Sequence, residues 1–340
     1  LVEYVWIGGN NELRCKTKVM DREVNSVDDL SEWNYDGSST NELTPEDSEI
    51  YLKPCAVFAD PFRKGSNVLV LCSTYDKEGN PMKNNHRHLA ESIFDDNLDF
   101  EPCFALEQEF ILMEGCPCHP SKKSNKPLGW GKGANPVGQY YCSVGSNNAF
   151  GRKIAEQAYH YCLEAGINAA GMNAGTSPGQ WEIQVGPCIG IDAADHLIVA
   201  RYIIARIGEL HNTQVSIHPN PINYDGNWEG SGCHVNFSTN KMREIGGINE
   251  IYKAINKLEL KHDEHMKIYG KDNIMRQSKN NNYLSKFSYG IANRSASVRI
   301  PRKVETDKKG YLEDRRPGAN IDPYLVTSKI FKTCCVDKEI

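Results

Sequence analysis

Two carboxylates, Glu107 and Glu109, stand two positions apart in the apolar segment 104–112. The segment lacks Gly and Pro and predicts a β-strand, on which side chains two residues apart point to the same face. Burying two unpaired charges together is costly, so we expect a cation between them. Ligands made only of oxygen favour a hard divalent ion such as Mg2+ or Mn2+. The alternative is an acidic edge that faces solvent and pairs with Lys or Arg, and these two residues alone leave both interpretations open.

Two further segments carry residues that could bind a metal or an anion. Glu182 is an isolated acid in the predicted strand 180–186, and His234 follows a Gly-rich turn at 230–232. A Gly-rich turn lets the backbone approach a phosphate closely, although this one is not a P-loop. A lone His is more often a packed core residue than a ligand, so neither segment is decisive by itself.

Arginines are concentrated in the segments 293–302 and 313–317, where they surround another acid, Glu313. An Arg side chain can hold a phosphate or a carboxylate through two parallel hydrogen bonds. The alternative is a charged face in contact with water. Val298 and Ile300 alternate with Arg299, so we expect Arg299 to face away from the core that its neighbours help to build.

The elements that must position these residues fall into two groups. Residues 2–75 predict a small β-rich unit, and the polar stretch 75–85 predicts a linker. The strands expected in this unit are 4–7, 13–19, 56–60 and 68–72. The larger α+β part that follows has expected helices at about 86–97, 149–165, 192–211, 247–269 and 322–334, with strands at 102–112, 180–186, 232–238 and 296–302. The stretch 113–139 is rich in Gly, Pro, Lys and Asn and predicts a long loop.

Composition excludes several classes of protein. The net charge of −5 over 340 residues argues against non-specific nucleic-acid binding. No apolar run is long enough to cross a membrane, and the start shows no signal peptide. The 12 cysteines show no CxxC spacing, which favours free thiols in a reducing cytoplasm. Because the sequence starts at Leu1 inside a strand-like segment, we expect further residues before it.

Taken together, these segments resemble the eukaryotic-type glutamine synthetases, which are glutamate–ammonia ligases. The resemblance runs in order from about residue 3 to residue 335. The matching stretches are residues 32–40, 60–64, 106–110, 180–182, 232–238, 292–302 and 313–317. Several of these stretches are long and unusual, which makes the resemblance specific.

The resemblance implies an α+β fold with two domains. Residues 1–80 would form a small β-grasp domain, and residues 81–340 a catalytic domain with a curved antiparallel sheet and flanking helices. It also implies a homo-oligomer of stacked five-membered rings, in which each active site lies between two subunits. Asp36 and Ser39 would then complete the site of a neighbouring subunit, and a single subunit would lack a full site.

The resemblance further implies ATP-dependent ligation of glutamate and ammonium to glutamine, through a γ-glutamyl phosphate. One Mg2+ or Mn2+ site would consist of Glu107, His234 and Glu313, and a second would include Glu109 and Glu182. Asp36 would take the proton of ammonium. The other residues carried over would bind substrates: Arg294 and Arg299 the phosphates, Asn236 and Ser238 the nucleotide, and Ser39, Arg276 and Arg315 the glutamate.

Three departures from the family pattern fall inside this expected site. Gly175 stands where the family has a third acidic ligand of the second metal. The segment 277–286, where the family carries a Glu on a loop that closes the site, contains no acid. Glu229 stands where the family has a neutral residue, and it would repel anions unless it points outward or replaces the missing metal ligand. Loss of even an outer-shell group costs about 10–100-fold in metal affinity or activity.

Two functions therefore stay open. The first is a ligase whose turnover these departures weaken. The second is a catalytically impaired homologue that serves as a structural or regulatory oligomer. A ligase for a different amine is a third and weaker alternative, because the ammonium pocket depends on the same loop.

Overall fold

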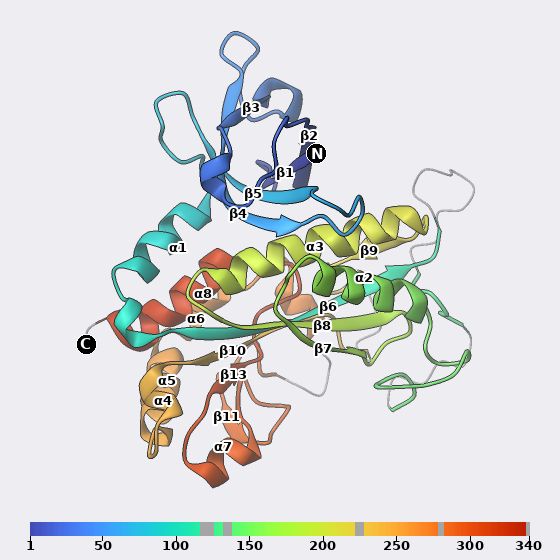
Figure 1. Ribbon diagram of the computed structural model, residues 1–340. Helices are drawn as coiled ribbons and strands as arrows, with labels where there is room; N and C mark the ends of the chain where they lie inside the picture. Colours follow the sequence, from blue (N-terminus) through green and yellow to red (C-terminus); the bar gives the residue numbers. More distant parts are fainter. Residues whose placement is uncertain (116–125, 132–137, 222–227, 278–281, 338–340) are drawn as a thin grey trace.

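The computed structural model describes residues 1–115, 126–131, 138–221, 228–277 and 282–337 (Figure 1). The N-terminal part forms a five-stranded sheet in the order β2-β1-β5-β4-β3. Its strands are β1 (Val2–Ile7), β2 (Leu13–Lys18), β3 (Trp33–Asp36), β4 (Glu49–Ala59) and β5 (Val68–Tyr75). The central strand β5 is buried along nearly its whole length, as expected for its run of β-branched and apolar residues.

A second, eight-stranded sheet lies below the first in Figure 1 and follows the order β11-β12-β13-β10-β6-β8-β7, with β9 paired to β6. Its strands are β6 (Cys103–Met113), β7 (Ala169–Ala174), β8 (Gln180–Ile189), β9 (Gln214–Ser216), β10 (Cys233–Ser238), β11 (Tyr289–Ile291), β12 (Val298–Ile300) and β13 (Leu312–Asp314). The predicted α+β class is confirmed. The sheet is not purely antiparallel, because β11 and β12 run parallel.

In Figure 1, the helices at residues 152–164 and 192–210 lie between this sheet and the N-terminal unit, whereas those at 240–243, 248–260 and 302–307 lie below the sheet. The helices are α1 (His86–Asp95), α2 (Arg152–Glu164), α3 (Asp192–Leu210), α4 (Asn240–Arg243), α5 (Ile248–Leu260), α6 (His262–Met266), α7 (Arg302–Asp307) and α8 (Pro323–Phe331). The main hydrophobic core lies between the sheet and α2, α3 and α8. Within the described part of the chain, no helix is both long and apolar enough to cross a bilayer.

Helix α3 explains which way the two carboxylates of β6 face. Its Arg201 is buried and donates to Gln108 Oε1 at 2.8 Å and to two backbone carbonyls. Because Gln108 faces α3, the alternation of a strand turns Glu107 and Glu109 to the opposite face of β6. Their predicted common face is therefore confirmed.

Several predicted elements differ in their boundaries. The helix expected over 247–269 is interrupted at Lys261 and becomes α5 and α6. The strand expected over 296–302 ends at Ile300, and α7 begins at Arg302. Five short strands, β3, β7, β9, β11 and β13, were not predicted, because they are three to six residues long and lack a clear apolar alternation. Most of the predicted loop 113–139 lies outside the described residues.

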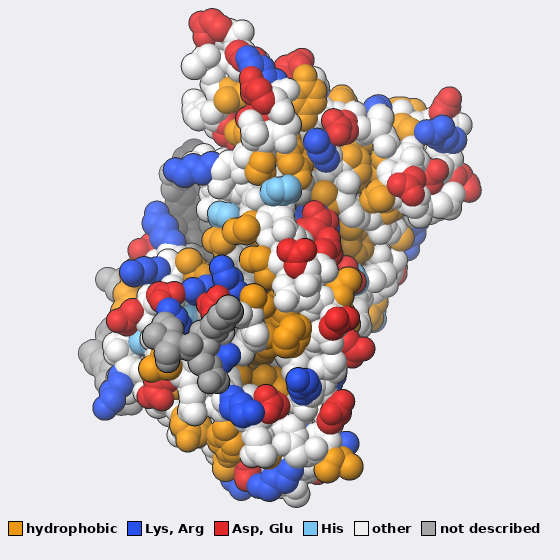
Figure 2. Space-filling model, turned by 90° about the vertical axis from the view of Figure 1, so that its left-hand side faces the viewer, with side chains coloured by type: hydrophobic (Ala, Val, Ile, Leu, Met, Phe, Trp, Pro, Cys, Tyr) orange, Lys and Arg blue, Asp and Glu red, His pale blue; other side chains and the backbone are white. Residues whose placement is uncertain are grey.

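Charged side chains are distributed over the exposed surface. Figure 2 shows acidic and basic side chains interspersed on one face of the molecule, with hydrophobic side chains between them. All ten cysteines of the described residues carry free thiols.

Candidate active site

The register of the large sheet places several predicted site residues directly opposite one another on neighbouring strands. The pairs that face each other on adjacent strands are His234 with Glu107, Glu109 with Glu182, and Arg299 with Glu313. Directly paired residues on neighbouring strands have their side chains on the same face, about 5 Å apart. One face of the sheet therefore gathers four carboxylates, an imidazole and a guanidinium from five strands.

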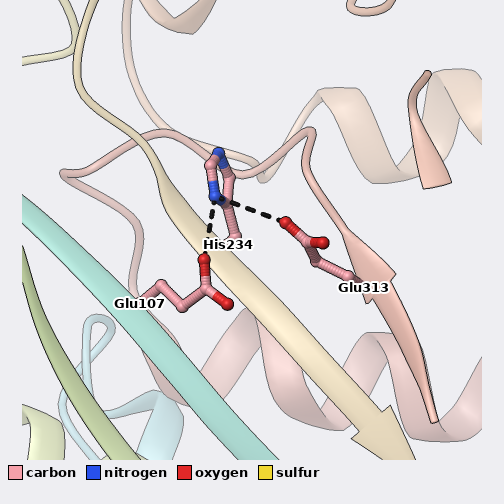
Figure 3. Close-up of side chains that lie close together, drawn as sticks. All are labelled: Glu107, His234 and Glu313. Atoms are coloured by element: carbon pink, nitrogen blue, oxygen red, sulfur yellow. Dashed lines mark hydrogen bonds and ion pairs between the residues drawn. The ribbon is translucent and has the colours of Figure 1, made fainter. Parts of the chain in front are cut away.

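Glu107, His234 and Glu313 form a compact cluster that could hold a metal ion (Figure 3). His234 Nδ1 lies 3.2 Å from Glu107 Oε2 and 3.7 Å from Glu313 Oε1, and the three ligand atoms lie within 4.8 Å of one another. Burial and the nearby Arg315 lower the pKa of His234 well below its usual value, which favours the neutral imidazole, the form that binds cations. Two carboxylates and a neutral imidazole fit a divalent ion.

Glu109 and Glu182 form a second acidic pair beside this cluster. Burial raises the pKa of Glu109, and burial together with repulsion from Glu109 and Glu107 raises the pKa of Glu182. Each carboxylate has a donor: Gly232 N lies 2.5 Å from Glu109 Oε2, and Gln184 Nε2 donates to Glu182 Oε1 at 2.9 Å. A cation between the two carboxylates would relieve their repulsion.

Gly175 lines the same cavity but contributes no ligand to this pair. A Cβ atom at position 175 would lie 2.6 Å from Gln180 Cγ, so the Gln180 side chain fills the space next to it. Gln180 Nε2 donates to Ser231 Oγ at 3.1 Å and reaches Glu109 Oε2 at 3.4 Å. An amide donor thus stands beside Glu109 where a third metal-binding carboxylate was expected, and the described residues around this pair do not complete a three-carboxylate site.

The two clusters open into a cavity of about 420 Å³ that is lined mostly by charged and polar residues. Its lining includes Glu107, Glu109, Glu182, Glu229, His234, Glu313, Arg276, Arg294, Arg299 and Arg315. A second cavity of about 450 Å³ has more apolar walls, including Phe104, Phe237, Tyr311 and the predicted nucleotide residues Asn236 and Ser238. Glu107 and Gln184 line both cavities, so the cluster of Glu107, His234 and Glu313 stands at their junction.

Three of the four arginines are fixed by groups of the fold. Arg276 is buried and donates from Nε to Asn273 Oδ1 at 2.9 Å and from Nη1 to the Tyr283 hydroxyl at 3.0 Å. Arg299 and Arg315 donate to the two oxygens of Glu313 at 3.0 and 2.6 Å. Arg299 points away from the core, as its alternation with Val298 and Ile300 predicted. These contacts hold the guanidinium groups in place before any substrate arrives.

Glu229 faces this cavity, so the alternative that it points outward is wrong. Its Oε2 lies 2.5 Å from Arg294 Nη2. The closing loop expected to lack an acid, residues 277–286, lies partly outside the described residues, and its described residue Tyr283 lines the cavity.

Asp36 and Ser39 are not brought to this cavity by the fold of a single subunit. Asp36 ends β3 in the N-terminal sheet and is exposed. Its carboxylate accepts hydrogen bonds from the Ser38 amide and from the hydroxyls of Ser38 and Ser39, and these bonds hold its pKa well below the usual value. An ionised acid is thus displayed on the surface of the N-terminal unit.

Some lining residues were not found from the sequence. Gln184 follows Glu182 by two positions on β8, so strand alternation could have placed it on the same face. Tyr141, Asn173 and Thr176 come from turns or a short strand, and no spacing in the sequence marks them.

Known proteins are similar to this chain over nearly its whole length. The family model described as glutamine synthetase, catalytic domain, matches residues 83–260. The glutamine synthetase of Agaricus bisporus is 49% identical over 340 residues, which cover 99% of this chain and 93% of that protein. The glutamine synthetase of Kluyveromyces lactis is 47% identical, with 98% of this chain and 88% of that protein covered. A putative glutamine synthetase of Acanthamoeba polyphaga mimivirus is also 47% identical, over 98% and 94%.

Proposed function

This chain belongs to the glutamine synthetase family, and we propose that it joins ammonia to glutamate with ATP, through a γ-glutamyl phosphate. The observation that carries this proposal is the cluster of Glu107, His234 and Glu313 at the junction of a charged and a more apolar cavity. The apolar cavity suits a nucleotide base, and the charged cavity suits phosphates and an amino acid.

We assign the binding roles on the same basis. Glu107, His234 and Glu313 would hold Mg2+ or Mn2+, which neutralises phosphate charge when bound. Asn236 and Ser238 would contact the nucleotide in the apolar cavity. The remaining assignments are Arg294 and Arg299 to the phosphates, Arg276, Arg315 and Ser39 to glutamate, and Glu109 and Glu182 to a second and weaker cation site.

In the proposed reaction, an oxygen of the substrate γ-carboxylate attacks the terminal phosphorus of ATP and ADP leaves. Ammonia then attacks the acyl carbon, and inorganic phosphate leaves. Fixed guanidinium groups such as Arg299 stabilise the charge on the transferred phosphoryl group. Asp36, which is ionised and exposed, would take the proton of the incoming ammonium.

We further propose that the site is shared between subunits of a homo-oligomer of stacked five-membered rings. Support comes from Asp36 and Ser39, which do not line the cavity of their own chain. The division into a β-grasp domain at residues 1–80 and a catalytic domain at residues 81–340, and a cytoplasmic location, belong to the same proposal.

One observation favours a second candidate function, a catalytically impaired oligomer with a structural or regulatory role. Gly175 supplies no metal ligand, and Gln180 fills the adjacent space. The acid missing from residues 277–286 is a second loss at the same site. Each loss of electrostatic stabilisation costs about 10²–10³-fold in rate, so the two together would reduce turnover below detection.

Ammonia-dependent release of phosphate from ATP and glutamate distinguishes the two candidates. We expect release with Mg2+ or Mn2+ that disappears in Glu107→Ala. Release that Glu107→Ala does not change would contradict the ligase assignment. An intact oligomer that binds ATP without any release would favour the impaired homologue.

A further inference from the structure

Glu229 and Arg294 form an ion pair across the charged cavity. The two residues lie 65 positions apart in the sequence, and both line the cavity, where Glu229 Oε2 is 2.5 Å from Arg294 Nη2. Their side chains are 44% and 60% exposed, so substrates in solution can reach both groups. Exposed ion pairs of this kind are weak, and an incoming anion can displace the carboxylate.

Arg294 differs in this respect from the other arginines of the cavity. Arg276 is buried among acceptors of the fold, and Arg299 and Arg315 share Glu313, a member of the metal-binding cluster. The carboxylate that faces Arg294 belongs to neither acidic cluster. Glu229 therefore occupies the place on Arg294 that an anionic substrate group would take.

The flanking residues keep Glu229 at this position. Trp228 packs against Trp130 and Tyr140, with ring centroids 5.0 and 6.1 Å apart. A Cβ atom at Gly230 would lie 2.0 Å from the Pro219 carbonyl oxygen and 2.6 Å from Arg276 Cβ, so the backbone there is tightly enclosed. With both neighbours held, a displaced Glu229 carboxylate stays close and returns at high effective concentration.

We propose that Glu229 is a positioning residue that pairs with Arg294 while the cavity is empty, so that a phosphate group binds Arg294 only by displacing the Glu229 carboxylate. The identity of the anion as a phosphate rests on the function proposed above. Glu229 then lowers the affinity of the cavity for phosphate without blocking the cavity. The exchange would also free the Glu229 carboxylate inside the cavity whenever a phosphate occupies Arg294.

A double-mutant cycle tests this exchange with inorganic phosphate as the probe. Calorimetry on the intact oligomer at low ionic strength would compare the unmodified protein with Glu229→Gln, Arg294→Gln and the double variant. We expect Glu229→Gln to bind phosphate about two- to fivefold more tightly, the range for an exposed ion pair. The same substitution in the Arg294→Gln background should give no gain. The matched control is Glu156→Gln, which removes an exposed carboxylate 3.2 Å from Arg152 on α2, outside the cavity.

Two results would overturn the proposal. An equal gain in both backgrounds would show that Glu229 acts by long-range repulsion, independently of Arg294. No gain in Glu229→Gln, including a failure of every variant to bind phosphate, would show that the pair does not control an anion site. Phosphate binding needs no turnover, so a protein that shows the expected cycle but makes no glutamine would contradict the proposed function and leave this inference standing.

Discussion

Glu109 and Glu182 lie directly opposite each other on β6 and β8, and both line the charged cavity on one side of the sheet. Like charges placed opposite each other on neighbouring strands destabilise a sheet. A cation bound between the two carboxylates would offset this repulsion. The stability of the protein should therefore depend on pH and on added metal through this pair.

The first prediction concerns the pH dependence of stability without metal. Burial raises the pKa of Glu109 to about 7, and burial with repulsion raises that of Glu182 to about 8. The ordinary value in the unfolded chain is about 4.3. These two carboxylates thus hold protons in the folded state that the unfolded state releases, and their contribution to stability falls as pH rises from about 5 to about 8. Buried histidines with lowered pKa values, such as His234, contribute the opposite trend below about pH 6.5, so the test is the difference between the unmodified protein and Glu182→Gln. Thermal unfolding of both in EDTA should show that Glu182→Gln gains stability relative to the unmodified protein as pH rises. A difference that does not change with pH would contradict the assignment.

Bound Mg2+ or Mn2+ should reverse that trend, because the ion competes with protons for the carboxylates of Glu109 and Glu182. The gain in unfolding temperature on adding Mn2+ should therefore be larger at pH 8 than at pH 6. Glu156→Gln, which lies on α2, is the control and should keep the full difference. An equal gain at both pH values would mean that the ion does not bind at carboxylates with raised pKa values.

The second prediction concerns position 175. Gly175→Glu alone should destabilise the protein by about 1–3 kcal/mol, because its Cβ would meet Gln180 Cγ at 2.6 Å. Gly175→Glu combined with Gln180→Ala should restore room for the new carboxylate and bind Mn2+ more tightly than the unmodified protein. Gly175→Ala is the matched control, since it brings the Cβ atom without the charge. Tight Mn2+ binding by Gly175→Glu alone would show that Gln180 moves aside freely.

Sequence reasoning succeeded where one strand determines the geometry. The alternation along β6 placed Glu107 and Glu109 on one face, and the alternation along β12 turned Arg299 toward the cavity. It failed where the arrangement depends on contacts outside a single strand. The contact of Glu229 with Arg294 spans 65 positions, and the position of Gln180 beside Gly175 depends on how a turn packs. Strands as short as β13 carry too few residues for a period to be recognised.

The third prediction concerns the cluster of Glu107, His234 and Glu313, which we propose as a metal site. Glu107→Gln keeps the size of the side chain but removes its charge, and it should lower Mn2+ affinity and phosphate release by about 100-fold or more. His234 and Asn236 both contact this carboxylate, at 3.2 and 2.9 Å, so the amide should keep the fold intact. Electron paramagnetic resonance would count bound Mn2+, and circular dichroism would check the fold. Unchanged Mn2+ binding would remove Glu107 from the cluster.

The last prediction tests whether sites are shared between subunits. Asp36→Ala and Glu107→Ala should each abolish phosphate release, for different reasons: the first removes the proposed acceptor of the ammonium proton and the second a metal ligand. If each site combines the N-terminal unit of one subunit with the cavity of its neighbour, mixed oligomers of the two variants contain some sites in which both residues are intact. Random mixing in equal amounts in a ring makes about one quarter of the sites complete.

Activity should therefore return when the two inactive variants are dissociated and reassembled together, to about one quarter of the unmodified level. Mixing without dissociation is the control and should give no recovery. Reassembled oligomers of normal size that stay inactive would mean that Asp36 serves the cavity of its own chain. Because the Asp36 carboxylate lies outside that cavity in the folded subunit, such a result would require the N-terminal sheet to move relative to the large sheet.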